Sequence, residues 1–144
     1  MRAHAAVALL VLMPLAACGG GLSEDELVSK GDAICKRVNT AVAKEPDPQT
    51  AEDLKALADK TVQISDPAIK DMQELEPPGE LEKDFDAFVA SLKKQRDLTK
   101  QIGDAAAAGD TAKIQQVGAD AQKAQVEYRR LASKIGFKEC GGGT

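Results

Sequence analysis

The clearest helical pattern in the chain is DTAKIQQVGADAQKAQVEYRRLASKIG, residues 110–136. Its apolar positions alternate in steps of three and four, which places them on one face of an α-helix. They are Ile114, Val117, Ala121, Ala124, Tyr128, Leu131 and Ile135. Asp110 is a typical N-cap and Gly136 a typical C-terminal stop, so the sequence predicts one long amphipathic helix between them.

Two upstream stretches have the same spacing. The first opens with a capping box from Ser23 to Glu26 and ends near Lys44, before two prolines. Its stripe is Leu27, Ile34, Val38 and Val42, with Gly31 in the seam. The second is capped by Thr50 and contains Pro67. Its apolar period continues across that proline through Leu54, Leu57, Thr61, Ile64, Ala68, Met72 and Leu75, so we expect a kink rather than a break and restart.

A further helix follows the turn at residues 76–79 and carries the stripe Leu81, Phe85, Phe88, Leu92, Thr99 and Ile102. It fades through residues 105–108, which we interpret as a frayed end rather than a docking face. Four amphipathic helices with short links predict an all-α fold, an antiparallel four-helix bundle with its second helix kinked at Pro67.

The composition of the 144 residues suits a single domain. Abundant alanine and few aromatic residues favour thin, closely packed helices over a β-sandwich. The formal net charge is −4, so the chain gains nothing from the phosphate attraction that drives nucleic-acid binding, and no nucleic-acid partner is expected.

The N-terminus has the pattern of a lipoprotein signal peptide. Arg2 supplies a positive charge, an apolar run follows, and Leu15-Ala16-Ala17 precedes Cys18. We predict that residues 1–17 are removed, with Leu15, Ala16 and Ala17 as the signal-peptidase recognition residues. Cys18 would carry the lipid, a diacylglyceryl group and acyl chains such as palmitate, on a glycine tether over residues 18–22. The alternatives are an uncleaved anchor and a plain secretory signal cut at Ala17.

Removal of this segment also removes the only histidine, His4. The mature chain then has no imidazole for Ser-His-Asp or Cys-His catalysis or for metal ligation. We therefore expect no catalytic residues, no cofactor and no metal site. The acidic clusters at residues 24–26 and 80–86 are interpreted as surface and helix-dipole charges rather than calcium ligands, because no EF-hand spacing is present.

Two cysteines remain, Cys35 and Cys140. In an exported protein an even remainder predicts one disulfide, here between the first helix and the end of the fourth. The chain-entropy model assigns such a long loop at most about 4.7 kcal/mol. A redox-active pair is disfavoured, because a C-x-x-C arrangement is missing.

The large side chains form either the core or the lining of an apolar pocket between helices. They are Met72, Phe85, Phe88, Tyr128 and Phe137. We favour the core, because a few large residues in an alanine-rich bundle usually fill it.

Four motifs carry a family resemblance: the Leu15–Cys18 segment, Gly31-Asp32-Ala33-Ile34-Cys35, Leu75-Glu76-Pro77-Pro78 and Ile135-Gly136-Phe137 with Cys140. With these, the chain resembles the small, helical, two-cysteine lipoproteins of high-GC Gram-positive bacteria. The resemblance implies a location on the extracytoplasmic face of the cell membrane and a disulfide, and it implies no activity.

The sequence thus predicts a lipid-anchored, monomeric helical domain over residues 23–140 with a flexible tail over residues 141–144. The preferred function is a non-enzymatic interaction module that presents a helical face to a cell-envelope protein or polymer. The alternative is a binding protein for a small apolar ligand held between the helices. The alternative needs a solvent-reached cavity with a few polar groups, whereas the preferred function needs an exposed apolar patch.

Overall fold

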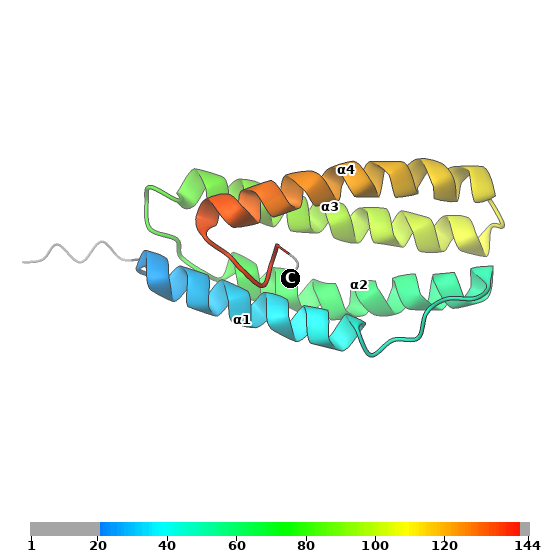
Figure 1. Cartoon of the computed structure of the whole chain (residues 1–144), viewed down its shortest axis with the longest axis horizontal. Coiled ribbons are helices and arrows are strands. Elements are labelled where there is room, and N and C mark those ends of the chain that lie inside the picture. The colour runs from blue at the N-terminus through cyan, green and yellow to red at the C-terminus, as the bar shows by residue number, and fades with distance from the viewer. Residues whose placement is uncertain (1–20, 142–144) are drawn as a thin grey trace, which may run out of the picture.

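The computed structural model describes residues 21–141. Within that range the chain forms four α-helices and no strand, which confirms the all-α prediction. The helices are α1 (Glu24–Val42), α2 (Ala51–Gln73), α3 (Glu82–Ala107) and α4 (Thr111–Ile135). They lie side by side, and the chain reverses direction between each helix and the next (Figure 1). The signal-peptide residues Leu15, Ala16, Ala17 and Cys18, and tail residues 142–144, lie outside the described residues.

The predicted N-caps explain where the helices begin. Ser23 accepts a hydrogen bond from the Glu26 backbone N–H at 3.3 Å, and the Glu26 carboxylate accepts one from the Ser23 backbone N–H at 2.9 Å. Thr50 and Asp53 form the same reciprocal box at the start of α2. The Asp110 carboxylate caps α4. Each cap satisfies backbone donors that have no partner within the helix.

Pro67 lies inside α2 without ending it, because the helix runs unbroken from Ala51 to Gln73. A proline removes the hydrogen bond to the carbonyl four residues earlier, here that of Gln63. Pro67 and Gln63 are both exposed, so water can solvate the freed carbonyl while Ala68 and Ile69 on the other face stay buried. The break and restart are therefore excluded, and the kink at Pro67 stays a prediction.

The end of α3 differs from the sequence expectation. Residues 105–107 are helical, and Ala105 and Ala106 are buried, so the prediction of a frayed end is wrong. The small side chains of these two alanines let the neighbouring helix approach closely and exclude water. At nearby Gly103 the two helices α2 and α3 are also close, since a Cβ built on this glycine would lie 2.8 Å from the Ala58 Cβ.

The helices differ in length, and α1 is the shortest. It has 19 residues against 26 in α3, which corresponds to a difference of about 10 Å along the bundle. Its close backbone contacts are with α2, while α3 lies between α2 and α4. The bundle therefore contains four helices at one end and three helices plus the loop over residues 43–50 at the other (Figure 1).

A segment after α4, the C-terminal hook (residues 136–141), joins α4 to α1. Gly136 adopts a left-handed conformation with φ 99°, and the Phe137 backbone N–H donates to the Ala132 carbonyl at 2.9 Å. This turn sends the chain back across α1. The Phe137 ring, 4% exposed, then lies directly over Gly31, where any side chain would collide with it.

Polar contacts and one covalent bond fix the hook on α1. The backbone N–H groups of Lys138 and Glu139 each donate to Asp32 Oδ1 at 2.9 Å. The Asn39 side-chain amide donates to the Glu139 carbonyl at 2.9 Å. Cys140 is bonded to Cys35, 105 residues earlier in the sequence. The predicted disulfide is present, and its partner on the C-terminal side is the hook rather than α4 itself.

The main core surrounds Phe88, which is fully buried. Its ring centroid lies 5.3 Å from that of Tyr128 and 5.0 Å from that of Phe137. Phe85 and Met72 are buried in the same cluster. All five large side chains singled out in the sequence are therefore buried. A smaller cluster of Leu98, Val117 and Ala124 lies further along α3 and α4.

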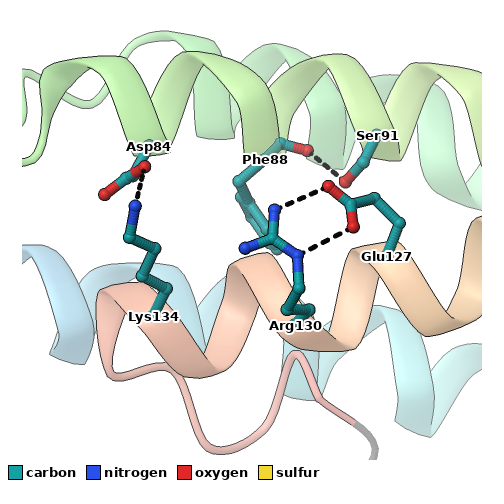
Figure 2. A network of polar contacts seen from close by, with 6 residues as sticks. All are labelled: Asp84, Phe88, Ser91, Glu127, Arg130 and Lys134. Atoms are coloured by element: carbon teal, nitrogen blue, oxygen red, sulfur yellow. Dashed lines mark hydrogen bonds and ion pairs between the residues drawn. The ribbon is translucent and has the colours of Figure 1, made fainter.

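Surface ion pairs accompany the α3–α4 contact. The Lys134 ammonium donates to the Asp84 carboxylate at 2.7 Å, linking the end of α4 to the start of α3 (Figure 2). Arg130 forms two hydrogen bonds with Glu127 on its own helix, and the Ser91 hydroxyl donates to the Phe88 carbonyl (Figure 2). Exposed pairs of this kind contribute little stability, so the core and the hook dominate.

The glycine at position 31 gives a direct test of the hook. In Gly31→Ala the new Cβ would lie 2.3 Å from the Phe137 ring, so we expect a loss of roughly 1–3 kcal/mol from overpacking. The matched control is Gly118→Ala in α4, where a Cβ meets nothing within 4 Å. That change should stabilise the protein by about 0.5–1 kcal/mol. Urea unfolding measures both, and equal stabilisation by the two substitutions would contradict the described packing.

Candidate functional site

A central pocket of about 220 Å³ lies between the four helices and the hook. Every helix contributes to its wall, and so does the disulfide. Its lining residues are Ile34, Cys35, Val38, Asn39, Thr61, Ser65, Ala68, Ile69, Met72, Leu92, Gln95, Arg96, Thr99, Gln125, Tyr128 and Cys140. Like the main core, it therefore draws on all parts of the fold.

The lining changes in character along the bundle. Toward the hook it is apolar, with Ile34, Met72 and Leu92 beside the disulfide. Toward the other end, where α1 finishes, polar side chains such as Gln95 and Gln125 replace them. The pocket therefore offers an apolar body and a polar end, which is the usual composition of a small-molecule site.

The pocket hydroxyl groups mostly donate to their own helices. Thr61 donates to the Leu57 carbonyl at 2.8 Å, Ser65 to the Thr61 carbonyl at 2.7 Å, and Thr99 to the Gln95 carbonyl at 3.0 Å. Because each hydroxyl has only one hydrogen, none of the three has a donor left for a pocket occupant.

Two nitrogen atoms near the polar end are buried without a hydrogen-bond partner, Gln95 Nε2 and Arg96 Nε. Arg96 is nevertheless charge-compensated, since its Nε lies 3.1 Å from Asp66 Oδ1 and its Nη1 lies 2.8 Å from Asp97 Oδ1. The Asp66 contact is an ion pair by distance whose angle does not suit a hydrogen bond. Gln95 has no such compensation, and its amide nitrogen is the one neutral donor in this set without a partner.

Tyr128 closes the pocket beside the disulfide. Its hydroxyl lies 3.8 Å from Cys35 Sγ, and it is the donor because a disulfide sulfur carries no hydrogen. Burial raises the pKa of Tyr128 to about 12, and the negative charge of Asp32 adds to the effect. The side chain therefore stays neutral and acts as a wall of the pocket rather than as a base.

The five residues predicted to be core or pocket do not divide between the two. All five belong to the main core, and Met72 and Tyr128 also line the central pocket. Phe85 is a core residue that also borders a surface depression next to the α2–α3 turn.

That depression, of about 580 Å³, and another of about 550 Å³ beside the α1–α2 loop are larger than the central pocket. Charged side chains make up much of their walls, including Glu76, Glu82 and Lys93 in the first. They lie at turns, where loops meet solvent, and neither contains an unpartnered buried group among residues 21–141. The central pocket is the better candidate site.

Two of the acidic residues weighed as calcium ligands make contacts within the protein. Glu26 completes the cap of α1, and the hydrogen bonds it receives from Ser23 lower the pKa of its carboxyl. Asp84 accepts from Lys134. In the part of the chain that the structure describes, no three Cys, His, Asp or Glu side chains gather as metal ligands would. Between residues 21 and 141 no helix is both long and apolar enough to cross a bilayer.

Sequence reasoning missed the polar end of the pocket, although a signal was present. Thr61 and Thr99 stood in otherwise apolar stripes, and Gln95 occupies the intervening stripe position between Leu92 and Thr99. Polar residues on the buried faces of two neighbouring helices indicate that the core is interrupted at that level.

Comparison of the chain with protein-family models, curated proteins and solved structures gives no match. The described residues define the chain as an all-α domain whose C-terminal hook is bonded to its first helix and whose four helices surround a mixed apolar and polar pocket.

Tyr128 provides a clean titration test because it is the only tyrosine and the chain has no tryptophan. Its pKa should be near 12 in the folded protein, against 10.0 when unperturbed, measured by near-ultraviolet absorbance. A raised pKa favours the neutral phenol in the folded state. Its stabilisation, roughly 2–3 kcal/mol, is thus complete below pH 10 and disappears as the pH rises toward 12.

The matched variant is Tyr128→Phe, which cannot ionise. Lysines also titrate in this window, so the quantity to compare is the difference in pH dependence of unfolding between the two proteins. A midpoint near 10 for the folded wild type would contradict the burial of this hydroxyl.

Proposed function

We propose that this chain is a lipid-anchored binding protein on the extracytoplasmic face of the cell membrane, which holds a small, largely apolar ligand between its helices. The observation that carries the proposal is the central pocket, with walls from all four helices and a mixed apolar and polar lining. The activity is binding rather than catalysis, because the lining offers no paired nucleophile and base.

The size of the pocket limits the ligand. Its volume of about 220 Å³ is below the usual range of drug-sized sites, which starts at about 300 Å³. It exceeds the volume of about 150 Å³ at which an engineered apolar cavity accepts benzene. The proposed ligand is therefore a single ring with a short substituent, or a branched molecule of similar size.

The other hypothesis, an interaction module for an envelope protein or polymer, has less support. It needs an exposed apolar patch, and among residues 21–141 the one strongly exposed large hydrophobic side chain is Val126, at 71%. A single such residue is ordinary for a protein surface. We therefore prefer the ligand-binding hypothesis over the interaction module favoured by sequence alone.

The position of the N-terminal end supports a close membrane attachment. The Leu22 backbone N–H donates to the Glu76 carbonyl at 2.8 Å, and this contact lies four residues after Cys18 in the sequence. Four residues span at most about 14 Å. A lipid on Cys18 would therefore hold the end of the bundle that carries the α2–α3 turn next to the bilayer.

Native mass spectrometry tests the binding proposal. The chain from Leu22 onward contains all the caps, core residues and the disulfide described above, and is to be produced with export in its own host. We expect a bound mass that is released on denaturation. Ala68→Leu, which fills the pocket, should lose that mass, and Ala119→Leu on the exposed face of α4 should keep it. A bare wild-type protein would count against ligand binding.

The anchor is tested by fractionation of cells. Cys18→Ser removes the lipidation site, so the protein should leave the membrane fraction. The matched control is Cys140→Ser, which breaks the disulfide but leaves Cys18 intact and should stay in the membrane fraction. Retention of both variants in the membrane fraction would contradict the lipid-anchor proposal.

A further inference from the structure

The arrangement at the polar end of the pocket identifies a feature of the ligand. We propose that the ligand is an uncharged molecule with an apolar ring or branched body and one hydrogen-bond acceptor, such as a carbonyl oxygen, that receives the side-chain amide of Gln95. The inference rests on the proposed function and specifies the ligand class of the same pocket.

Gln95 is the group that selects the acceptor. It lines the pocket, and its Nε2 is buried with no hydrogen-bond partner. An unpaired amide donor removed from water is unfavourable, so an acceptor in the pocket is favoured there. The nitrogen has almost no accessible surface in the structure, so it does not face the open space of the pocket there; because the terminal amide torsion is broad, the group can turn toward an occupant.

Four other donors of the pocket lining are already committed, and the amide of Gln125, which also lines the pocket, is not among the buried unpartnered groups. The hydroxyls of Thr61, Ser65 and Thr99 donate to carbonyls of their own helices. The Asn39 amide donates to the hook at Glu139. Of these polar side chains, Gln95 alone has a buried donor without a partner.

The charges around the pocket indicate an uncharged ligand. Arg96 is the only basic side chain in the lining, and Asp66 and Asp97 both lie within ion-pair distance of it. These two carboxylates more than balance its charge, so an anion would gain no net attraction there. No acidic side chain lines the pocket, and the carboxylates of Asp66 and Asp97 are more than half exposed, so water and salt screen their attraction for a cation in the pocket.

The apolar body of the ligand would lie in the part of the pocket nearest the hook. Ile34, Met72 and Leu92 form that part of the wall, and Met72 is almost completely buried. Leu92 and Gln95 lie within one turn of α3, so the apolar wall and the amide are close together. A ring placed against Leu92 would therefore bring a substituent of one or two atoms toward Gln95.

A pair of probes with the same shape tests the acceptor. Acetophenone carries a carbonyl oxygen, and α-methylstyrene has a methylene group in its place. Each is titrated into ¹⁵N-labelled chain from Leu22 onward and followed by nuclear magnetic resonance. We expect acetophenone to bind about tenfold more tightly, and to shift the side-chain amide signal of Gln95.

Two variants assign the preference to the amide. Gln95→Leu removes the polar group, and Gln95→Glu keeps the shape but replaces the donor by a carboxylate. Both should lose the preference for acetophenone, measured within each variant as the ratio of the affinities for the two probes. The second variant keeps the test decisive if the first does not fold. Benzoate, the charged analogue, should bind more weakly than acetophenone.

The outcomes separate the two proposals. Equal affinity of the wild type for both probes, or a preference that survives in either variant, would overturn the acceptor inference and leave ligand binding standing. Tighter binding of benzoate would overturn the uncharged class. Binding of neither probe, together with a bare protein in the mass spectrum, would overturn the proposed function and the inference with it.

Discussion

The contact between Phe137 and Gly31 is the constraint on which the rest of the structure depends. A ring can lie against a helix backbone only where no side chain intervenes, so this glycine determines where the C-terminal hook crosses α1. Asp32, the next residue, accepts hydrogen bonds from the backbone of the hook, and Cys35, one turn further along α1, forms the disulfide with it. One stretch of α1 thus supplies the apolar, polar and covalent parts of a single attachment.

This attachment also explains why the bundle contains a pocket. The hook fills the space beside α1 at one end, and the main core gathers around it. Further along, α1 ends before α3 does, and the buried faces of α2 and α3 become polar. Neither the main core nor the small cluster around Val117 extends across that level. Six residues of the main core also line the pocket, so the pocket extends from the main core into this polar level.

The sequence allowed prediction of features that depend on neighbouring residues or on counting. The cap at Ser23 needs only Glu26, and the disulfide followed from the two cysteines that remain when Cys18 is assigned to the lipid. The hook was beyond prediction, because Gly31 was visible as a seam glycine but the ring that requires it lies more than a hundred residues away. Asp32 likewise has partners only in three dimensions. The polar face at Gln95 was not predicted, because the two apolar stripes were interpreted as continuous through Thr61 and Thr99.

The attachment of the hook has a consequence for the order in which the protein matures. A chain that emerges from its N-terminus presents Cys35 early, while Phe137 and Cys140 appear only after all four helices have been made. Until then the surface of α1 at Gly31 is uncovered, and the main core lacks the Phe137 ring. Helices form quickly from local contacts, whereas this closure joins distant residues and is slow. The final residues of the domain thus complete its packing. A chain interrupted just before them would form helices but would lack the Phe137 contact and the disulfide.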